Sequence, residues 1–305
     1  MRLSEKLEKK ESGILLYGLT PPKKKTPEEK VIEISRRQMD AVNSIGVDGL
    51  ILYDIHDEKD RISDERPFPF LETIDPVIYS SEYMKDLEVP RIVYRCVGKY
   101  AEEELMKWMD DETRQDHHTV FVGAASKSQE VKLRLNEAYA LYNAPENPLS
   151  LGGVCIPERH TIKETEHLRM IKKQEQGCKY FISQAVYNVE AAKNFLSDYY
   201  FHCTENEIEM VPIIFTISPC GSKKTLDFMK WLGINVSKWL ENDILKAENT
   251  LEKSVEVCIE NFEILWQYAK KKNIPIGCNV ESISIRKSEI EASIDMAKAV
   301  KKIML

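Results

Sequence analysis

Residues 152–184 begin Gly-Gly-Val-Cys-Ile-Pro-Glu-Arg-His, continue through a lysine-rich stretch and end Gly-Cys-Lys-Tyr-Phe-Ile-Ser-Gln. The first apolar run stops at Pro157, because proline cannot continue a central strand. The stretch 163–176 has the apolar spacing of a helix, and Gly177 closes it. A second apolar run then ends at Gln184. This part of the chain therefore predicts a strand, a helix and a second, parallel strand.

The same alternation of strand and helix recurs along the whole sequence. The predicted strands are 13–19, 49–53, 91–97, 119–123, 153–156, 180–183, 209–216 and 274–280. The predicted helices are 27–44, 101–109, 130–143, 163–176, 189–199, 223–231, 251–272 and 288–304. Eight such units predict an α/β protein, a single (βα)8 TIM barrel over residues 1–305. A doubly wound open sheet is the alternative, but no Gly-x-Gly-x-x-Gly motif follows any strand.

Composition narrows the class of protein. The chain has 305 residues, of which 43% are hydrophobic, and this is enough for a substantial core. No apolar run approaches the roughly 18 residues of a membrane span, and the charged stretch 1–12 lacks the apolar core of a signal peptide. A net charge of −7 argues against nucleic acid as a partner. The seven cysteines are scattered, and Cys96, Cys155 and Cys278 lie in apolar runs, which predicts buried thiols and a cytoplasmic protein.

Two of the connections between predicted strands and helices contain additional segments. Residues 57–75 follow the second strand and contain Arg-Pro-Phe-Pro-Phe at 66–70. A long insertion at the catalytic face could be a lid or a substrate wall, or simply a packed surface loop. Residues 236–246 are expected to be a plain connection.

In a β/α barrel, the carboxyl ends of the strands converge on one mouth, where active sites lie. The polar residues expected there are Asp54, His56, Arg95, residues 123–128, Glu158, His160, Gln184, Thr216, Ser218, Asn279 and Glu281. Such a set of carboxylates, amides and hydroxyls suits a pterin-like heterocycle, whose edge carries amide and amine groups.

Several of these residues also have a structural interpretation. Glu158 could cap the following helix, and the lysines of 163–176 could form a solvated face. Asp54 and His56 lack a partner motif, so no metal site is predicted. Residues 218–224, rich in Ser, Gly and Lys, could bind phosphate at a helix start or only cap that helix. The pair 117–118, two histidines, precedes a strand at the opposite end of the barrel and is interpreted as structural.

Pro-Glu-Arg-His at 157–160, the lysine helix and the Phe-Ile-Ser-Gln run resemble the central motif of methylenetetrahydrofolate reductases. The resemblance is strongest over 150–190 and extends more loosely from Thr20-Pro21-Pro22 to the last helix. It implies that Gln184 contacts a folate. It also implies that His160 and Lys173 contact a flavin, FAD, and that Ser126 lies in a turn near that flavin.

The sequence departs from the family at two acidic positions. The family has an acid in the first strand that assists protonation of the folate, and here that position falls on or near Gly18. The family also has an acid in the turn after strand four, and here that turn reads Gly-Ala-Ala-Ser-Lys at 123–127. Both departures argue against flavin chemistry of the usual kind, and they are compatible with a divergent, flavin-independent branch.

Two functions follow from the resemblance. The first is an oxidoreductase of one-carbon metabolism and methionine biosynthesis, passing hydride from NAD(P)H to 5,10-methylenetetrahydrofolate. In it Asp54, Glu158 or Glu281 would supply the proton, and Gln184, Thr216 and Asn279 would bind the substrate. The second is a non-reducing barrel that binds a folate or C1 carrier as a methyltransferase component or partner subunit. A homo-oligomer is compatible with either function.

Overall fold

The computed structural model describes residues 2–57, 64–111, 118–123, 131–143 and 149–305. Eight parallel strands pair in chain order and close on themselves, β1 with β8, so the predicted (βα)8 TIM barrel is confirmed. The strands are β1 (Leu15–Leu19), β2 (Gly49–Leu52), β3 (Arg91–Cys96), β4 (His118–Val122), β5 (Ser150–Cys155), β6 (Tyr180–Ala185), β7 (Ile213–Ile217) and β8 (Ile276–Glu281). Every predicted strand overlaps one of these.

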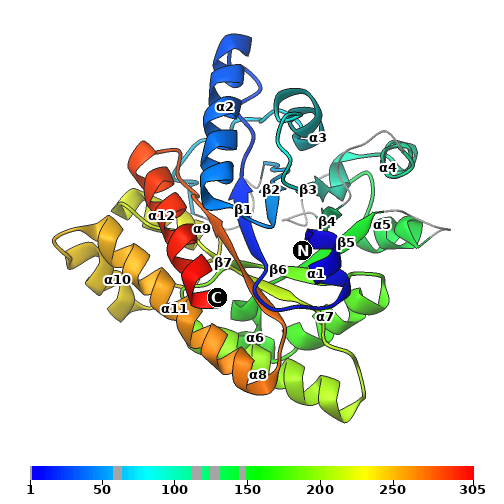
Figure 1. Ribbon diagram of the computed structural model, residues 1–305, viewed down its shortest axis with the longest axis vertical. Coiled ribbons are helices and arrows are strands. Elements are labelled where there is room, and N and C mark those ends of the chain that lie inside the picture. Colours follow the sequence, from blue (N-terminus) through cyan, green and yellow to red (C-terminus); the bar gives the residue numbers. More distant parts are fainter. Residues whose placement is uncertain (1, 58–63, 112–117, 124–130, 144–148) are drawn as a thin grey trace.

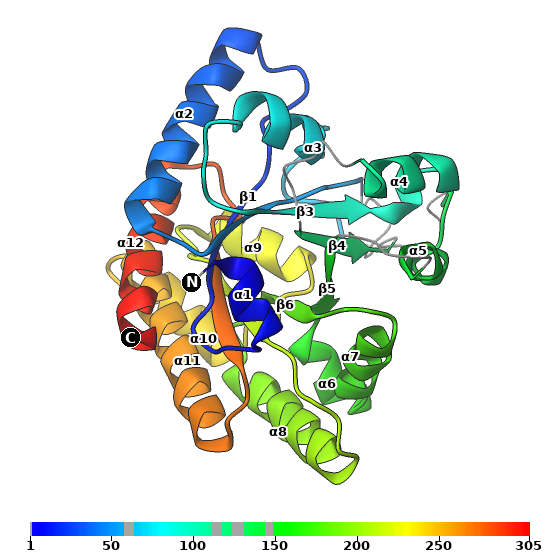
Figure 2. The same ribbon diagram turned by 45° about the vertical axis from the view of Figure 1, so that its right-hand side comes forward.

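Helices surround the strands (Figures 1 and 2). They are α1 (Leu3–Glu8), α2 (Glu28–Ile45), α3 (Pro76–Ile78), α4 (Glu102–Met109), α5 (Leu135–Tyr142), α6 (Pro157–Lys163), α7 (Glu166–Glu175), α8 (Val189–Glu205), α9 (Lys223–Trp231), α10 (Lys238–Lys246), α11 (Thr250–Lys272) and α12 (Lys287–Met304). A π-helical turn, Tyr79–Tyr83, follows α3, and a 3-10 turn, Val97–Lys99, follows β3.

The prediction was wrong at two of these helices. The residues after Pro157 form α6 rather than a loop, because proline suits the first turn of a helix as well as the end of a strand. Glu164 takes a left-handed conformation (φ 51°), which ends α6 before α7 begins. The expected plain connection at 236–246 contains α10, whose Leu240 and Ile244 are buried.

The amino-terminal end of the barrel is closed by α1. Leu3 and Leu7 are buried with the inward-facing Leu16, Ile51 and Ile92 in one apolar cluster. In Figure 1, α1 lies across the centre of the ring of strands. Nε2 of His118, at the start of β4, lies 3.3 Å from the hydroxyl of Ser4 in α1, at the end of the barrel where the histidine pair was expected, while residue 117 lies outside the described residues.

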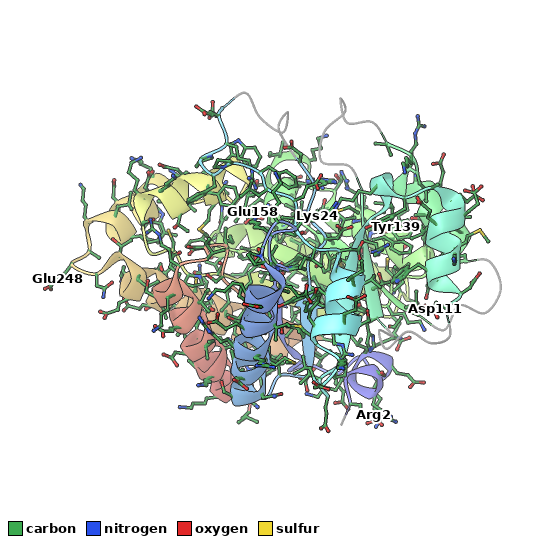
Figure 3. The ribbon with its side chains drawn as sticks, turned by 90° about the horizontal axis from the view of Figure 1, so that it is seen from above. Arg2, Lys24, Asp111, Tyr139, Glu158 and Glu248 are labelled. Carbon is green, nitrogen blue, oxygen red and sulfur yellow. The ribbon has the colours of Figure 1, made fainter. Side chains whose placement is uncertain are left out.

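The carboxyl-terminal end carries the mouth. Figure 3 views the barrel from the side, with Arg2 towards one end and Lys24 and Glu158 towards the other. The outer faces of the strands pack against the helices in a second, larger apolar cluster. All seven thiols are buried, including the three predicted to be. Within the described residues, no helix has both the length and the apolar character that crossing a bilayer requires.

Candidate ligand-binding site

Four polar side chains meet inside the mouth of the barrel. The amide nitrogen of Asn279 (β8) donates to the hydroxyl oxygens of Tyr53 (3.0 Å) and Thr216 (3.1 Å). Both amide protons are thus used, and the Tyr53 hydroxyl is left to donate towards Glu281 at the end of β8. Asn279 and Thr216 are buried, whereas Tyr53 and Glu281 are half-buried, so these last two form the open side of the network.

Burial sets the protonation of this network. Loss of hydration raises the pKa of Glu281 to about 7, although the hydrogen bond from the Tyr53 hydroxyl opposes the rise. Burial, and then the nearby Glu281, raise the pKa of Tyr53 well above its usual value, so its hydroxyl stays protonated. The oxygen of the Asn279 amide is buried and has no hydrogen-bond partner among the described residues. The site therefore combines a carboxyl group that titrates near neutrality, a fixed donor and an unused acceptor.

Gly18 lies next to this network, at the position where the resemblance leads one to expect an acid. A Cβ atom there would lie 2.8 Å from both Cε2 and Oη of Tyr53. The tyrosine ring thus fills the space that a side chain at position 18 would need. Gly18 pairs directly with Glu281 across the β1–β8 ladder, so a carboxyl group stands on the neighbouring strand instead.

Asp54 is buried but does not face the network. Its carboxylate is ion-paired with Lys99 and accepts hydrogen bonds from the Cys96 amide (2.8 Å) and the Tyr100 hydroxyl (3.0 Å). These contacts tie the end of β2 to the residues that follow β3. They indicate an anchoring role for the carboxylate.

Glu158 lies in the first turn of α6 and is buried. Loss of hydration raises its pKa to about 8, and repulsion from Glu166 adds to this. Neither of its carboxylate oxygens has a hydrogen-bond partner among the described residues, so it does not act as the helix cap that was one interpretation.

Gln184 stands at the carboxyl end of β6, as predicted. Between the pairs Ile182–Ile214 and Ala185–Thr216, β6 has one residue more than β7, which is a β-bulge. The Gln184 amide donates to the carbonyl oxygen of Leu232, just after α9, at 2.6 Å. Its nitrogen is therefore already engaged at the rim of the mouth.

His160 and Lys173, two of the three residues expected to hold a flavin, do not come together in the mouth. His160 is buried between helices, where its Nε2 lies 2.9 Å from a carboxylate oxygen of Asp198 in α8. The Lys173 ammonium donates to the carbonyl oxygen of Val154 at 2.5 Å, from the helical layer outside β5. Ser126 lies outside the described residues. The expectation that His160 points into the mouth is thus wrong, and the described residues do not fit a flavin site built on this motif.

A cavity of about 580 Å³ opens beside the mouth. Its lining comes from the loops after β1, β2 and β3 and from the inserted segment, and it is made up of Lys24, Asp54, Ile55, His56, Asp57, Phe70, Glu72, Thr73, Ile74, Asp75, Ile78, Lys99 and Tyr100. Lys24 and Lys99 are its two cations.

The described part of the inserted segment, residues 64–75, is held in place by contacts at both of its ends. Its Arg66 guanidinium lies 4.9 Å from the ring centre of Phe228 and 5.3 Å from that of Trp231, both in α9. The indole of Trp231 donates to the carbonyl oxygen of Asp64 at 3.0 Å. At the other end, the Lys24 amide donates to the Glu72 carbonyl oxygen at 2.9 Å. The described part of this segment is therefore a wall of the mouth.

Sequence reasoning missed Tyr53 and Tyr94, which pack edge to face with their ring centres 4.9 Å apart. Tyr53 follows the last residue of β2, so its place directly before Asp54 was the available signal. Lys99 was missed too, because it follows β3 in a turn that the sequence does not mark.

A solved structure with 51% sequence identity resembles this chain over its whole length. It is an uncharacterized protein from Clostridium thermocellum that binds two copies of 5-methyl-5,6,7,8-tetrahydrofolic acid. The match covers 99% of each chain, with a TM-score of 0.88.

Two distant solved structures also match the chain, with low similarity. Dihydropteroate synthase from Xanthomonas albilineans has 10% identity and a TM-score of 0.46, over 96% of this chain and 93% of its own. A Schiff-base-forming fructose-1,6-bisphosphate aldolase has 9% identity and a TM-score of 0.49, over 98% and 96%. No family model matches the chain, and no curated protein does.

Proposed function

The chain belongs to the same family as the Clostridium thermocellum protein, and we propose that it likewise binds a reduced folate of the 5-methyltetrahydrofolate type in the mouth of the barrel. The observation that carries this proposal is the network of Glu281, Tyr53, Asn279 and Thr216. The network offers both hydrogen-bond donors and hydrogen-bond acceptors at the open end of the barrel. Its Asn279 and Thr216 side chains are buried beneath those of Tyr53 and Glu281.

The chemistry of the network suits a pterin. The pterin edge carries a ring N–H and an exocyclic amine side by side, and an ionised carboxylate can accept a hydrogen bond from each. Glu281 is the half-buried carboxylate of the network and takes this role. Tyr94 and Tyr53 provide aromatic surface next to it.

The related protein binds two copies of its folate, and a second site is part of the proposal. The cavity of about 580 Å³ lies within the roughly 300–1,000 Å³ typical of ligand pockets. Phe70 and Tyr100 offer aromatic surface there, and Lys24 can meet the carboxylates of a folate tail.

Calorimetric titration of the whole chain with 5-methyltetrahydrofolate tests both sites. We expect two equivalents to bind. Glu281→Gln should remove or weaken one binding event, and Lys24→Ala combined with Phe70→Ala should remove the other. Glu291→Gln, an exposed carboxylate of α12 paired with Lys287, is the matched control and should leave both events intact. Absence of binding by the wild-type chain would overturn the proposal.

The role that follows is a non-reducing one, in which the barrel carries or presents the folate as a methyltransferase component or partner subunit. Reduction of 5,10-methylenetetrahydrofolate by NAD(P)H is the second candidate. One observation favours it: Glu281 stands directly across the ladder from Gly18 and could supply the proton that the missing acid gives in the reductases. NAD(P)H consumption with methylenetetrahydrofolate, with and without added FAD, separates the two. Folate binding without NAD(P)H consumption supports the non-reducing role.

A further inference from the structure

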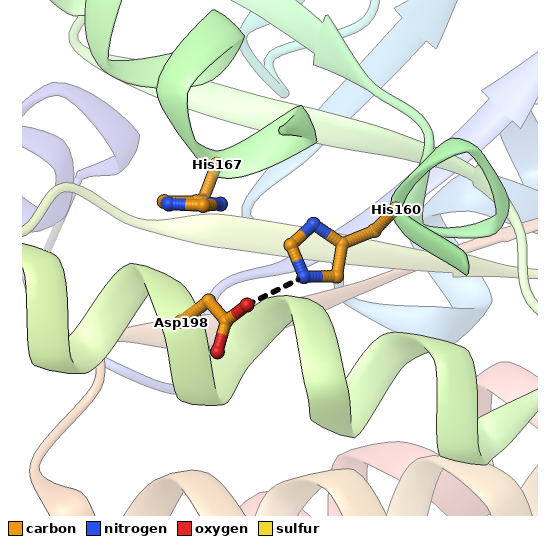
Figure 4. A group of neighbouring side chains, drawn as sticks. All are labelled: His160, His167 and Asp198. Atoms are coloured by element: carbon orange, nitrogen blue, oxygen red, sulfur yellow. Dashed lines mark hydrogen bonds and ion pairs between the residues drawn. The ribbon is translucent and has the colours of Figure 1, made fainter. Parts of the chain in front are cut away.

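Three of the chain's six histidines gather outside the barrel, on helices that lie together in both Figures 1 and 2. His160 belongs to α6, His167 to α7 and His202 to α8. Asp198, also on α8, completes the group. Figure 4 shows the His160, His167 and Asp198 side chains converging from the three helices. One ligand atom from each of these three lies within 4.8 Å of the others.

The polar atoms of this cluster are only partly satisfied. Nε2 of His160 lies 2.9 Å from a carboxylate oxygen of Asp198. The Nδ1 atoms of His160 and His167 are buried, and neither has a hydrogen-bond partner in the described part of the chain. Since the imidazole of His160 is only 2% exposed, hydration cannot compensate for this. Two buried ring nitrogens without partners call for an explanation, and a bound cation that orders both rings is one.

A fourth ligand is available on the same helix. Asp198 and His202 are four residues apart on α8, so they share one face of the helix. The ring of His202 packs edge-on against that of His167, with the ring centres 5.6 Å apart. Three imidazoles and one carboxylate form a nitrogen- and oxygen-rich set of the kind that binds zinc tetrahedrally.

We propose that His160, His167, Asp198 and His202 form a binding site for a divalent transition-metal ion of the zinc type. The side chain of Asp198 is 49% exposed, so an ion can enter from solvent and the carboxylate can turn from His160 towards it. Zinc holds nitrogen ligands at roughly 2.0–2.1 Å, so the ligand atoms must draw closer than they stand now. The bound ion would tie α6, α7 and α8 together, and it would act on the stability of the barrel rather than in its mouth.

The test uses the full chain, freed of metal by a chelator and then titrated with Zn²⁺ in a calorimeter and with Co²⁺ in a spectrophotometer. We expect one equivalent to bind, a visible Co²⁺ spectrum of the tetrahedral type and a higher midpoint of thermal unfolding with Zn²⁺. Loss of a metal's outer-shell partner alone weakens binding ~10–100-fold, so Asp198→Asn and His167→Gln should each weaken it at least that much.

Glu190→Gln on the same helix is the matched control, because Glu190 is exposed and pairs with Lys193 away from the cluster. It should bind Zn²⁺ like the wild type. The His160→Gln variant could fail to fold, because His160 is buried. The test therefore relies on Asp198→Asn, which changes a half-exposed side chain. If Zn²⁺ does not bind in stoichiometric amount, or if Asp198→Asn and His167→Gln bind it unchanged, the cluster is only a hydrogen-bonded histidine–aspartate pair and the proposal fails.

Discussion

Gly18 and Glu281 are direct partners in the ladder that closes the barrel between β1 and β8. The ring of Tyr53 fills the space beside Gly18, and its hydroxyl faces Glu281. The resemblance leads one to expect a carboxyl group at position 18 on β1. The structure has glycine there and places the carboxyl group of Glu281 beside it, on the neighbouring strand β8. This relationship makes position 18 a sensitive test of the site.

Gly18→Ala should destabilise the protein, because the new Cβ would lie 2.8 Å from the Tyr53 ring. Overpacking of this kind costs ~1–3 kcal/mol of unfolding free energy, which denaturant titration can measure. In a Tyr53→Ala background the same substitution should cost much less, since the obstructing ring is gone. Gly123→Ala is the control, because its Cβ would meet Leu135 at an ordinary 3.5 Å. Equal costs in both backgrounds would mean that Tyr53 is not what excludes a side chain at position 18.

Glu281→Gln should change how stability depends on pH. Burial raises the pKa of this carboxyl from 4.5 to about 7, so between these values the folded chain binds the proton more tightly than the unfolded chain. The wild type therefore loses stability as pH rises from about 4.5 to 7, and the glutamine variant lacks that loss. We expect the variant to gain relative to wild type by at most ~3 kcal/mol above pH 7, and to show no such gain below pH 4.5. Thermal unfolding across this range measures the difference, and parallel curves would contradict it.

The two candidate functions predict opposite effects of pH at Glu281. If the carboxylate accepts hydrogen bonds from a pterin, folate affinity should rise as pH increases and level off above about 7, where the group is ionised. If the carboxyl group donates a proton to the folate during reduction, turnover should instead fall above about 7. Calorimetry and NAD(P)H oxidation across pH 5.5–8.5 distinguish these outcomes. Glu281→Gln should flatten whichever profile is found.

Asp54→Asn should act on stability and leave folate affinity at the Glu281 site unchanged. The substitution removes the charge that pairs with the Lys99 ammonium and weakens the contacts with the Cys96 amide and Tyr100. Breaking a fully buried ion pair by removing one partner costs ~3–5 kcal/mol, and the cost here should be smaller because the Lys99 side chain is 32% exposed. Denaturant titration and calorimetry together measure both effects. A stable variant that lost turnover would restore Asp54 to the catalytic role that the sequence suggested.

Arg66→Ala should loosen the wall of the mouth. The guanidinium is stacked among aromatic rings of α9 and donates to the Phe68 carbonyl oxygen at 2.7 Å. Each cation–π contact contributes ~0.5–1 kcal/mol, so the variant should be cleaved faster in segment 64–75 and bind folate more weakly. Limited proteolysis followed by mass spectrometry locates the cuts. Arg36→Ala, on the exposed face of α2, should digest like the wild type.

The sequence predicted the barrel well because strands and helices leave strong local signals. Apolar runs ended by Pro, Gly or polar residues placed all eight strands, and Gly177 marked the end of α7 correctly. The same kind of signal failed at Pro157, which ends a strand and begins a helix with equal ease. Because of this ambiguity, His160 was expected in a loop at the mouth. In the structure it lies on α6, a helix that faces α8.

The site was harder to predict because side-chain direction depends on distant partners. The bulge in β6 and the Leu232 carbonyl set where Gln184 points, and neither is visible in the local sequence. Asp54 and Glu281 both follow apolar runs, yet Asp54 meets a lysine from the turn after the next strand and Glu281 meets the half-buried Tyr53. Only the closed ring of strands decides which carboxyl group is paired with a lysine and which lies beside a tyrosine.

Because α1 covers the amino-terminal end of the ring with Leu3 and Leu7, and apolar side chains fill the ring itself, the described residues leave the carboxyl-terminal end as the side from which a ligand approaches. The two folate sites proposed above therefore open on the same face of the protein. Anything that docks over that face would cover both sites at once.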